Sequence, residues 1–290
     1  MSKHILVTGA NGQLGNEMRN ILTRREDVVA YFTDANELDI TSKGDVDSFF
    51  DNHPVDYLVN CAAYTAVDKA EDAPELCARL NAHAVALLAE AAHNHGAKMV
   101  QISTDYVFNG ENFRPYREDD ATCPVSVYGE TKLKGEKQLL EIAPDSVILR
   151  TAWLYSPYGH NFVKTMINLG HEKKQLKVIF DQVGTPTYAK DLAAAVMIVI
   201  DAPAWHSGIY HFSDEGAISW YDFAQAIHRL AGIETCTVLP CRTQEYPTRA
   251  HRPHYSVLDK SKYKATFNTV IPYWVDSLAH CIARITTHNE

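Results

Sequence analysis

A tyrosine and a lysine four residues apart are the side chains in this sequence best suited to proton transfer. Tyr128 and Lys132 fall in a segment with helical periodicity, so they share one face of the expected helix. A free phenol has a pKa of about 10, and an adjacent cation, together with a nicotinamide, would favour its ionised form and lower that pKa. Tyr128 would then be a general acid tuned by Lys132. A solvated pair on a helix surface is the alternative for these two residues alone.

A hydroxyl at the end of a strand could assist the same chemistry. Ser103, Thr104 and Asp105 follow a short apolar run at 99–102 that predicts a buried strand. Ligands of open α/β sheets bind beyond the carboxyl ends of the strands. We therefore expect Thr104 to hydrogen-bond a carbonyl oxygen that Tyr128 protonates, as in the reduction of a ketone.

A glycine-rich segment at residues 8–15 follows the first apolar run and opens the first helical pattern. Gly9 permits a tight turn, Gly12 lets the backbone approach a pyrophosphate, and Gly15 permits close packing of the helix. The amide groups at the helix N-terminus favour a bound anion. The segment predicts a dinucleotide site, and a glycine-rich turn without a ligand is the alternative.

Two aspartates compete for the adenosine end of this dinucleotide. Asp34 follows the second apolar run, where an acidic residue commonly accepts hydrogen bonds from the ribose hydroxyls. No arginine follows it to neutralise a 2′-phosphate, which favours NADH over NADPH. A loop aspartate often caps a turn instead, and Asp39 lies nearby, so the cofactor is NADPH or NADH.

Short apolar runs alternate with helical patterns through the first half of the chain. The expected strands are 5–7, 28–32, 57–59, 99–102 and 147–149, and the expected helices are 12–24, 45–50, 80–95, 128–142, 161–170, 189–200 and 220–231. This pattern predicts an α/β fold with a Rossmann-type doubly wound parallel sheet. We expect a dinucleotide-binding domain at 1–155, completed by about 178–210, and a smaller substrate-binding lobe mostly at 156–290.

The composition narrows the class of partner. The chain has 290 residues, is 46% hydrophobic and carries a net charge of −9 without a basic cluster, which argues against nucleic acid as a partner. No apolar run approaches the ~20 residues of a membrane span, so we expect a cytoplasmic protein. The six cysteines show no paired spacing and are expected to be reduced thiols.

Several stretches carry a family resemblance over essentially the whole length. They are the glycine segment at 8–15, NCAAYTAVDKAE at 60–71, STDYVF at 103–108, YGETK at 128–132, RTAWLY at 150–155 and RP at 252–253. Together they resemble the dTDP-4-dehydrorhamnose reductase family of extended short-chain dehydrogenases/reductases. The glycine and Tyr-x-x-x-Lys motifs are common to many such reductases, whereas the stretches at 65–71 and 103–108 are specific to this family.

The resemblance implies roles for individual residues. Catalytic residues would be Thr104, Tyr128 and Lys132, the last two also contacting the cofactor. Cofactor contacts would further include Gly12, Gln13 and Leu14 at the pyrophosphate, Asp39 and Ile40 near the adenine, and Ala62, Ala63 and Tyr64. The sugar would lie between Val67, Asp105, Tyr106 and Trp153, beside Thr104. Trp153 follows a strand, so packing in the core is its alternative role.

The activity implied is reduction of the C4 keto group of dTDP-4-dehydro-L-rhamnose to dTDP-L-rhamnose by NADPH or NADH. The sequence leaves the stereochemistry at C4 open, and we expect a monomer or weak homodimer. A nucleotide-sugar dehydratase or epimerase is one alternative, but similar dehydratases carry Asp-Glu after the threonine, where this chain has Asp105-Tyr106. A regulatory subunit similar to that of methionine adenosyltransferase is another, but it would not need Tyr128, Lys132 and Thr104 together.

A metal contact known in similar bacterial reductases bears on the oligomeric state. Glu17 and Asp191 match two carboxylates of a magnesium-linked dimer, but Lys190 stands where a third would be. An ammonium group opposes a hard cation electrostatically. We therefore expect a metal-independent enzyme without that dimer. The alternative is that Lys190 swings away from this position and pairs with a carboxylate such as Glu17.

Overall fold

The protein is built around one parallel sheet. In the computed structural model, which describes residues 2–287, six strands lie in the order β10-β5-β4-β3-β1-β2, and every neighbouring pair is parallel. These strands are β1 (Lys3–Thr8), β2 (Val28–Thr33), β3 (Tyr57–Asn60), β4 (Lys98–Thr104), β5 (Val147–Thr151) and β10 (Gly208–His211). The chain leaves β1 for β2 on one side and later adds β3 on the other. The predicted doubly wound α/β fold is confirmed, with its switch point between β1 and β3.

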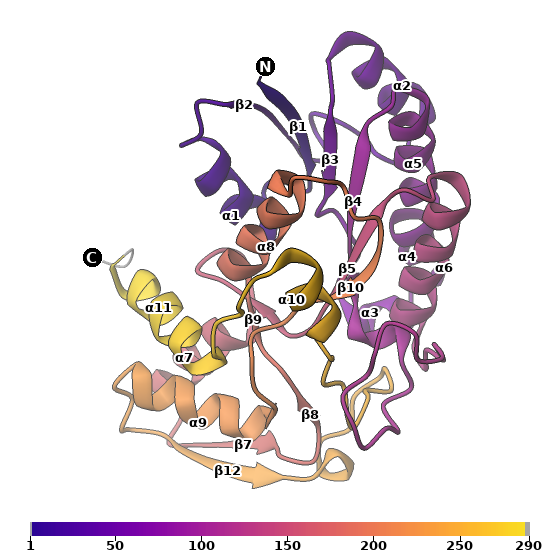
Figure 1. Cartoon of the computed structure of the whole chain (residues 1–290). Coiled ribbons are helices and arrows are strands. Elements are labelled where there is room, and N and C mark those ends of the chain that lie inside the picture. Colours follow the sequence, from indigo (N-terminus) through magenta and orange to yellow (C-terminus); the bar gives the residue numbers. More distant parts are fainter. Residues whose placement is uncertain (1, 288–290) are drawn as a thin grey trace.

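Helices cover both faces of this sheet (Figure 1). They are α1 (Gln13–Leu22) and α8 (Ala189–Asp201) on one face, and α2 (Lys43–Asn52), α5 (Ala84–Asn94) and α6 (Val127–Ile142) on the other. Successive strand residues point to opposite faces, so Ile5 and Val7 pack under α1 and α8 while Leu6 packs under α5. Both faces are covered, which is why the strands are apolar at nearly every position.

The later half of the chain adds a smaller layer below the large sheet (Figure 1). Its elements are β6 (Leu154–Tyr155), α7 (Phe162–Glu172), β7 (Gln175–Ile179), β8 (Val183–Gly184), β9 (Thr187–Tyr188), β11 (Ile218–Ser219), α9 (Trp220–Leu230), β12 (Thr237–Cys241) and α11 (Trp274–Thr287). Short two-stranded pairs, β7 with β12, β8 with β11 and β6 with β9, frame it. Its core contains Phe223, Trp274 and Leu278.

The structure refines several expected elements. The expected helix at 80–95 is the end of a longer helical stretch formed by α4 (Pro74–Ala78), a π-helical turn η1 (Arg79–His83) and α5. β10, α10 (Ser261–Phe267) and α11 were not predicted. In the segment 189–211, β10 joins the large sheet and α8 packs against one of its faces. β8 and β9, which precede this segment, pair with other short strands instead. The domain boundaries themselves stay a prediction.

Three one-turn helices lie at the loop ends near the sheet. They are α3 (Val67–Ala70), the 3-10 turn η2 (Asp105–Val107) directly after β4, and the 3-10 turn η3 (Thr243–Glu245). Across residues 2–287, no helix combines the length and the apolar character that a membrane crossing needs.

Candidate active site

The ends of β1, β2 and β3 surround a cavity of about 310 Å³ at the switch point of the sheet. Its lining residues are Thr8, Gly9, Gly12, Thr33, Asp34, Ala35, Leu38, Asp39, Ile40, Cys61, Ala62, Ala63 and Leu80. Seven of the residues expected to bind a dinucleotide are thus brought together: Gly9, Gly12, Asp34, Asp39, Ile40, Ala62 and Ala63. A cavity at this place, beyond the carboxyl ends of parallel strands, is where α/β sheets hold nucleotides.

The glycine turn is held tightly between the sheet and the first helix. Gly9 has φ +65°, and a Cβ there would lie 2.7 Å from the Cα of Ala62. A Cβ on Gly15 would lie 2.4 Å from the carbonyl oxygen of Gly9, so the helix can approach the turn only because Gly15 lacks one. The turn therefore leaves backbone amides, and no side chain, at the start of α1.

Three expected cofactor residues are not among those that line the cavity. Leu14 is buried in the core beneath the sheet, and Gln13 Oε1 accepts hydrogen bonds from Ser156 and Asn161. Gln13, Leu14 and Gly15 do not line the cavity, but they form the first turn of α1, where amide groups lack partners within the helix. A pyrophosphate would be bound there by these amides.

The two competing aspartates both line the cavity and both stabilise loops. Asp34 accepts from the amides of Asn11 at 3.0 Å and Ala35 at 2.9 Å. Asp39 accepts from the hydroxyl and amide of Thr41, and these bonds hold the pKa of Asp39 below its usual range. Each aspartate therefore caps a turn, which was the alternative role considered from the sequence. Each also lines the cavity at a position suited to contact ribose or adenine.

The three expected catalytic residues meet at the end of β4. Ser126 caps α6 by accepting from the amide of Gly129, which places Tyr128 in the first turn of the helix. Thr104 is the last residue of β4 and neighbours the Tyr128 phenol, while its own hydroxyl donates to Asp105 Oδ1 at 3.0 Å. Lys132 is buried one turn later on α6.

Burial dominates the electrostatics of Tyr128 and Lys132. Burial raises the pKa of Tyr128, and Lys132 is not among the groups that offset it. The Lys132 Nζ donates to the backbone carbonyl of Ile102 at 2.6 Å, and burial lowers the pKa of Lys132 to about 8. The protein groups by themselves do not lower the pKa of Tyr128, because the ammonium is bound to a carbonyl and is itself desolvated. The phenol is therefore protonated at neutral pH but is a weaker acid than a free phenol. The lowering expected from Lys132 together with the nicotinamide stays a prediction.

The expected sugar-binding residues Asp105 and Tyr106 lie beside Tyr128. Asp105 Oδ1 accepts from Thr104 Oγ1 at 3.0 Å, and Oδ2 has no hydrogen-bond partner within residues 2–287. Burial raises the pKa of Asp105 to about 6. The Tyr106 ring meets the Tyr128 ring edge-on with centroids 5.5 Å apart. This end of the site offers an acceptor and an aromatic surface next to the proton donor.

Val67 and Trp153 are placed by packing. Val67 is the first residue of α3 and is half-buried. Trp153 has φ +48°, a left-handed conformation that costs ~1–3 kcal/mol, and it stacks on Trp220 with centroids 3.5 Å apart. A Cβ on Gly184 would lie 2.7 Å from the Trp153 ring. Trp153 therefore packs in the core, which was the alternative role considered from the sequence. Its contact with a sugar stays a prediction.

Sequence reasoning missed the residues that hold the site residues in place. Asn81, in the π-helical turn, accepts from the amide of Tyr64 at 2.8 Å and donates to its carbonyl at 3.1 Å, so it fixes an expected cofactor residue. Glu136 forms a buried ion pair with Arg150 and accepts from Ser103, which ties α6 to β4 and β5. Neither has a spacing that predicts these partners, since they lie far apart in the chain.

The carboxylates considered for a metal have protein partners. Glu17 is buried and pairs with Arg284 at 2.6 Å, and Asp191 accepts from Ser277. Lys190 is exposed, so the partner considered for Glu17 was wrong and Arg284 takes that place. The metal-independent enzyme stays a prediction.

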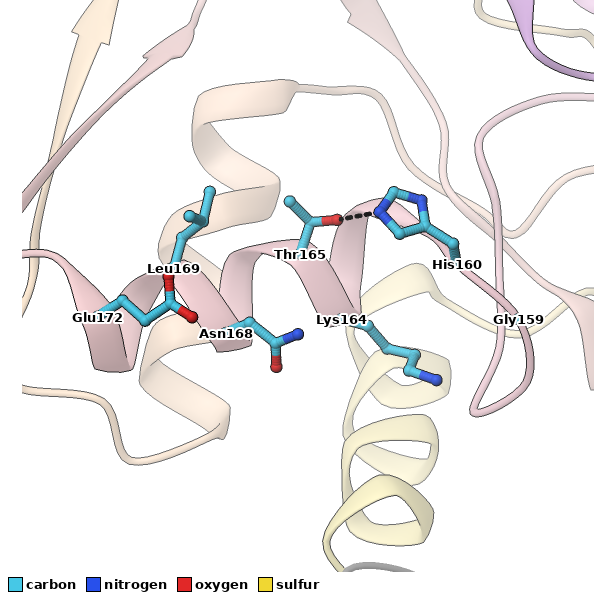
Figure 2. Close-up of a pocket in the computed structure, with 7 residues that line it drawn as sticks. All are labelled: Gly159, His160, Lys164, Thr165, Asn168, Leu169 and Glu172. Carbon is cyan, nitrogen blue, oxygen red and sulfur yellow. Dashed lines mark hydrogen bonds between the residues drawn. The ribbon is translucent and has the colours of Figure 1, made fainter.

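A second cavity, of about 370 Å³, lies along the outer side of α7 (Figure 2). Its lining residues are Gly159, His160, Lys164, Thr165, Asn168, Leu169 and Glu172. None of the expected site residues is among them. The candidate active site is therefore the region at the ends of β1 to β4.

Comparisons with known proteins show which proteins the chain is similar to. Residues 3–287 match the family described as the RmlD substrate binding domain. The chain is 39% identical over 283 residues to a dTDP-4-dehydrorhamnose reductase of Aggregatibacter actinomycetemcomitans, with 94% of this chain and 96% of that protein covered. It is 42% identical to the spore coat polysaccharide biosynthesis protein SpsK of Bacillus subtilis, with 88% of each covered. A dTDP-4-dehydrorhamnose reductase of Bacillus anthracis, solved in complex with NADP, is 37% identical, with a TM-score of 0.94, 98% of this chain and 100% of that chain covered.

Proposed function

Since the chain belongs to the RmlD family of dTDP-4-dehydrorhamnose reductases, we propose that it reduces the C4 keto group of dTDP-4-dehydro-L-rhamnose to dTDP-L-rhamnose with NADPH or NADH. The observation that carries the proposal is the meeting of Tyr128 and Thr104 at the end of β4, one strand away from the cavity at the switch point. A proton donor and a hydroxyl next to a dinucleotide site are what reduction of a ketone requires.

The residues around the cavity fit a nicotinamide dinucleotide. Gly9 and Gly15 keep side chains out of the start of α1, so its amides are open to a pyrophosphate. Asp34 and Asp39 offer acceptors at the adenosine end, and Asp34 favours NADH. Arg79 acts electrostatically on Asp39 and is a cation available to a 2′-phosphate, which favours NADPH. The bound NADP of the Bacillus anthracis relative supports the second cofactor as well.

The protein groups divide the reaction between them. The nicotinamide, when bound, supplies the hydride. The Thr104 hydroxyl, which donates to Asp105 Oδ1 in this structure, turns to donate a hydrogen bond to the C4 oxygen, and Tyr128, a phenol that is protonated at neutral pH, donates its proton to the forming alkoxide. Lys132 binds the nicotinamide ribose, and Asp105 accepts from a sugar hydroxyl through Oδ2. Tyr106, and in our proposal Val67 and Trp153, pack against the deoxysugar ring.

The substrate is the finer part of the proposal, since relatives carry other names as well. They include SpsK and a probable 4-ketoreductase acting on another dTDP sugar in Streptomyces antibioticus. A coupled assay with dTDP-4-dehydro-L-rhamnose and each of NADH and NADPH tests it directly. We expect stoichiometric oxidation of the cofactor and a product with the rhamno configuration by NMR. Turnover without net oxidation of the cofactor would support a dehydratase or epimerase, and the epimeric product would support a sister reductase.

A further inference from the structure

A segment near the C-terminal end of the second layer crosses the sugar end of the site. We call residues 246–256 the strap. Its second half is held by backbone hydrogen bonds, from Tyr255 to the carbonyl of Gly110 and in both directions between Val183 and the strap. Its first half is held differently, by side chains of the neighbouring α3 region.

Asp68, on α3, is the centre of that attachment. Its Oδ1 accepts from the amide of Ala250 at 3.1 Å, and its Oδ2 accepts from Arg252 Nη2 at 2.7 Å. Burial alone would raise the pKa of Asp68, but the amide and the guanidinium hold it below its usual range. One carboxylate thus binds the strap twice, once by its backbone and once by its side chain.

Arg252 continues the contact toward the reacting groups. Its other terminal nitrogen, Nη1, donates to the Tyr106 hydroxyl at 3.2 Å. The Tyr106 ring in turn packs edge-on against Tyr128. A guanidinium has a rigid fork of donors, so Arg252 can hold Asp68 and Tyr106 at once in a fixed geometry.

We propose that Asp68 and Arg252 form a clasp that positions Tyr106 beside Tyr128 and so determines how tightly the nucleotide sugar binds. Both are positioning residues, because they act on the substrate through Tyr106. The inference rests on the proposed function for the identity of the sugar. It adds to that function a reason why two stretches 184 residues apart serve one site.

A second ion pair on the same strap is a matched control. Arg249 pairs with Asp72, just beyond α3, and both side chains are more than half exposed, at 62% and 52%. This pair also ties the strap to the α3 region, but its hydrogen bonds do not reach Tyr106. If the Asp68–Arg252 pair only anchored the strap, breaking either ion pair would affect substrate binding equally. If it positions Tyr106, only breaking the Asp68–Arg252 pair should weaken substrate binding.

The test compares KM and kcat for the Arg252→Gln, Asp68→Asn and Arg249→Gln variants. For Arg252→Gln and Asp68→Asn we expect KM for the nucleotide sugar to rise about 10- to 100-fold, as for loss of a hydrogen bond to a charged group. KM for the cofactor should stay within about twofold, and kcat should fall less than KM rises. Arg249→Gln should change neither constant by more than about twofold. Equal effects of the Arg252 and Arg249 variants would overturn the inference.

The route through Tyr106 is tested by combining variants. Tyr106→Phe removes the hydroxyl that Arg252 holds, so Arg252→Gln should add less than about threefold to KM in that background. If the increases in KM caused by Tyr106→Phe and Arg252→Gln multiply in the double variant, Arg252 acts independently of Tyr106 and the positioning role is refuted. Arg252→Lys keeps the charge near Asp68 but not the second donor, and we expect KM between those of the wild type and Arg252→Gln.

A measurement without turnover separates this inference from the proposed function. Hydrogen exchange of strap residues 248–252, followed by mass spectrometry, should be about tenfold faster in Asp68→Asn than in Asp72→Asn. Binding of the nucleotide sugar dTDP-L-rhamnose, measured by calorimetry, should weaken in Asp68→Asn only. If the wild type fails to reduce dTDP-4-dehydro-L-rhamnose while these differences appear, the substrate assignment fails and the clasp stands. If the two variants exchange and bind alike, the clasp fails whatever the substrate.

Discussion

Removing the Tyr128 hydroxyl is the sharpest perturbation of the proposed chemistry. Tyr128→Phe deletes one oxygen and leaves the ring, which packs edge-on against Tyr106. The hydroxyl lies next to Thr104, and burial raises its pKa above the ordinary value of a phenol. The substitution therefore removes the proton donor and changes the volume of the site very little.

The expected sizes of the two effects differ widely. Loss of a general acid costs about 10²- to 10⁴-fold in rate, which corresponds to about 3–5 kcal/mol of transition-state stabilisation. The folded state loses one neutral hydrogen bond, worth about 1 kcal/mol. In a chain of this length that lowers Tm by roughly 2 °C. Cofactor affinity should change little, because the glycine turn and Asp34 are untouched.

The assay measures kcat, the dissociation constant of NADPH or NADH by fluorescence, and Tm on the same samples. Tyr155→Phe is the matched control, since the Tyr155 hydroxyl is buried in the core of the smaller layer without a partner among residues 2–287. We expect wild-type kcat for the control. A Tyr128→Phe enzyme that retains more than a tenth of the rate would refute the assignment of Tyr128 as the proton donor.

Three further predictions follow from the charged groups. Lys132→Met should lower both cofactor affinity and rate, and the wild-type rate should fall as pH rises through about 8, where Lys132 loses its proton; a change in Tm alone would favour a purely structural lysine. Asp34→Ala should weaken NADH more than NADPH, because the carboxylate repels a 2′-phosphate; equal losses would point to Asp39 or to damage of the loop. Excess chelator should leave turnover and native mass unchanged, because Glu17 is already paired with Arg284; loss of activity or of a dimer on chelation would contradict this.

The local parts of the fold were predictable because their signals are local. Runs that are apolar at every position predict strands covered on both faces, and the glycines at 9, 12 and 15 lie where a strand passes directly into a helix. Helices with strong periodicity, such as α6 and α8, were placed within a few residues of their ends. The short strands after residue 153 carry two to five residues each, too few for a periodic pattern, so their pairing was not predicted.

The amino-acid sequence by itself determined the fold class, the dinucleotide turn and the spacing of Tyr128 and Lys132, because each depends on residues within one or two turns of chain. Only the tertiary structure decided that Lys132 binds the Ile102 carbonyl, that Glu17 pairs with Arg284, and that Asp68 holds Arg252. Burial and the partners of a charged group depend on which distant segments pack around it. Burial by distant segments likewise raises the pKa of Tyr128, so the chemistry of the site is a property of the folded chain.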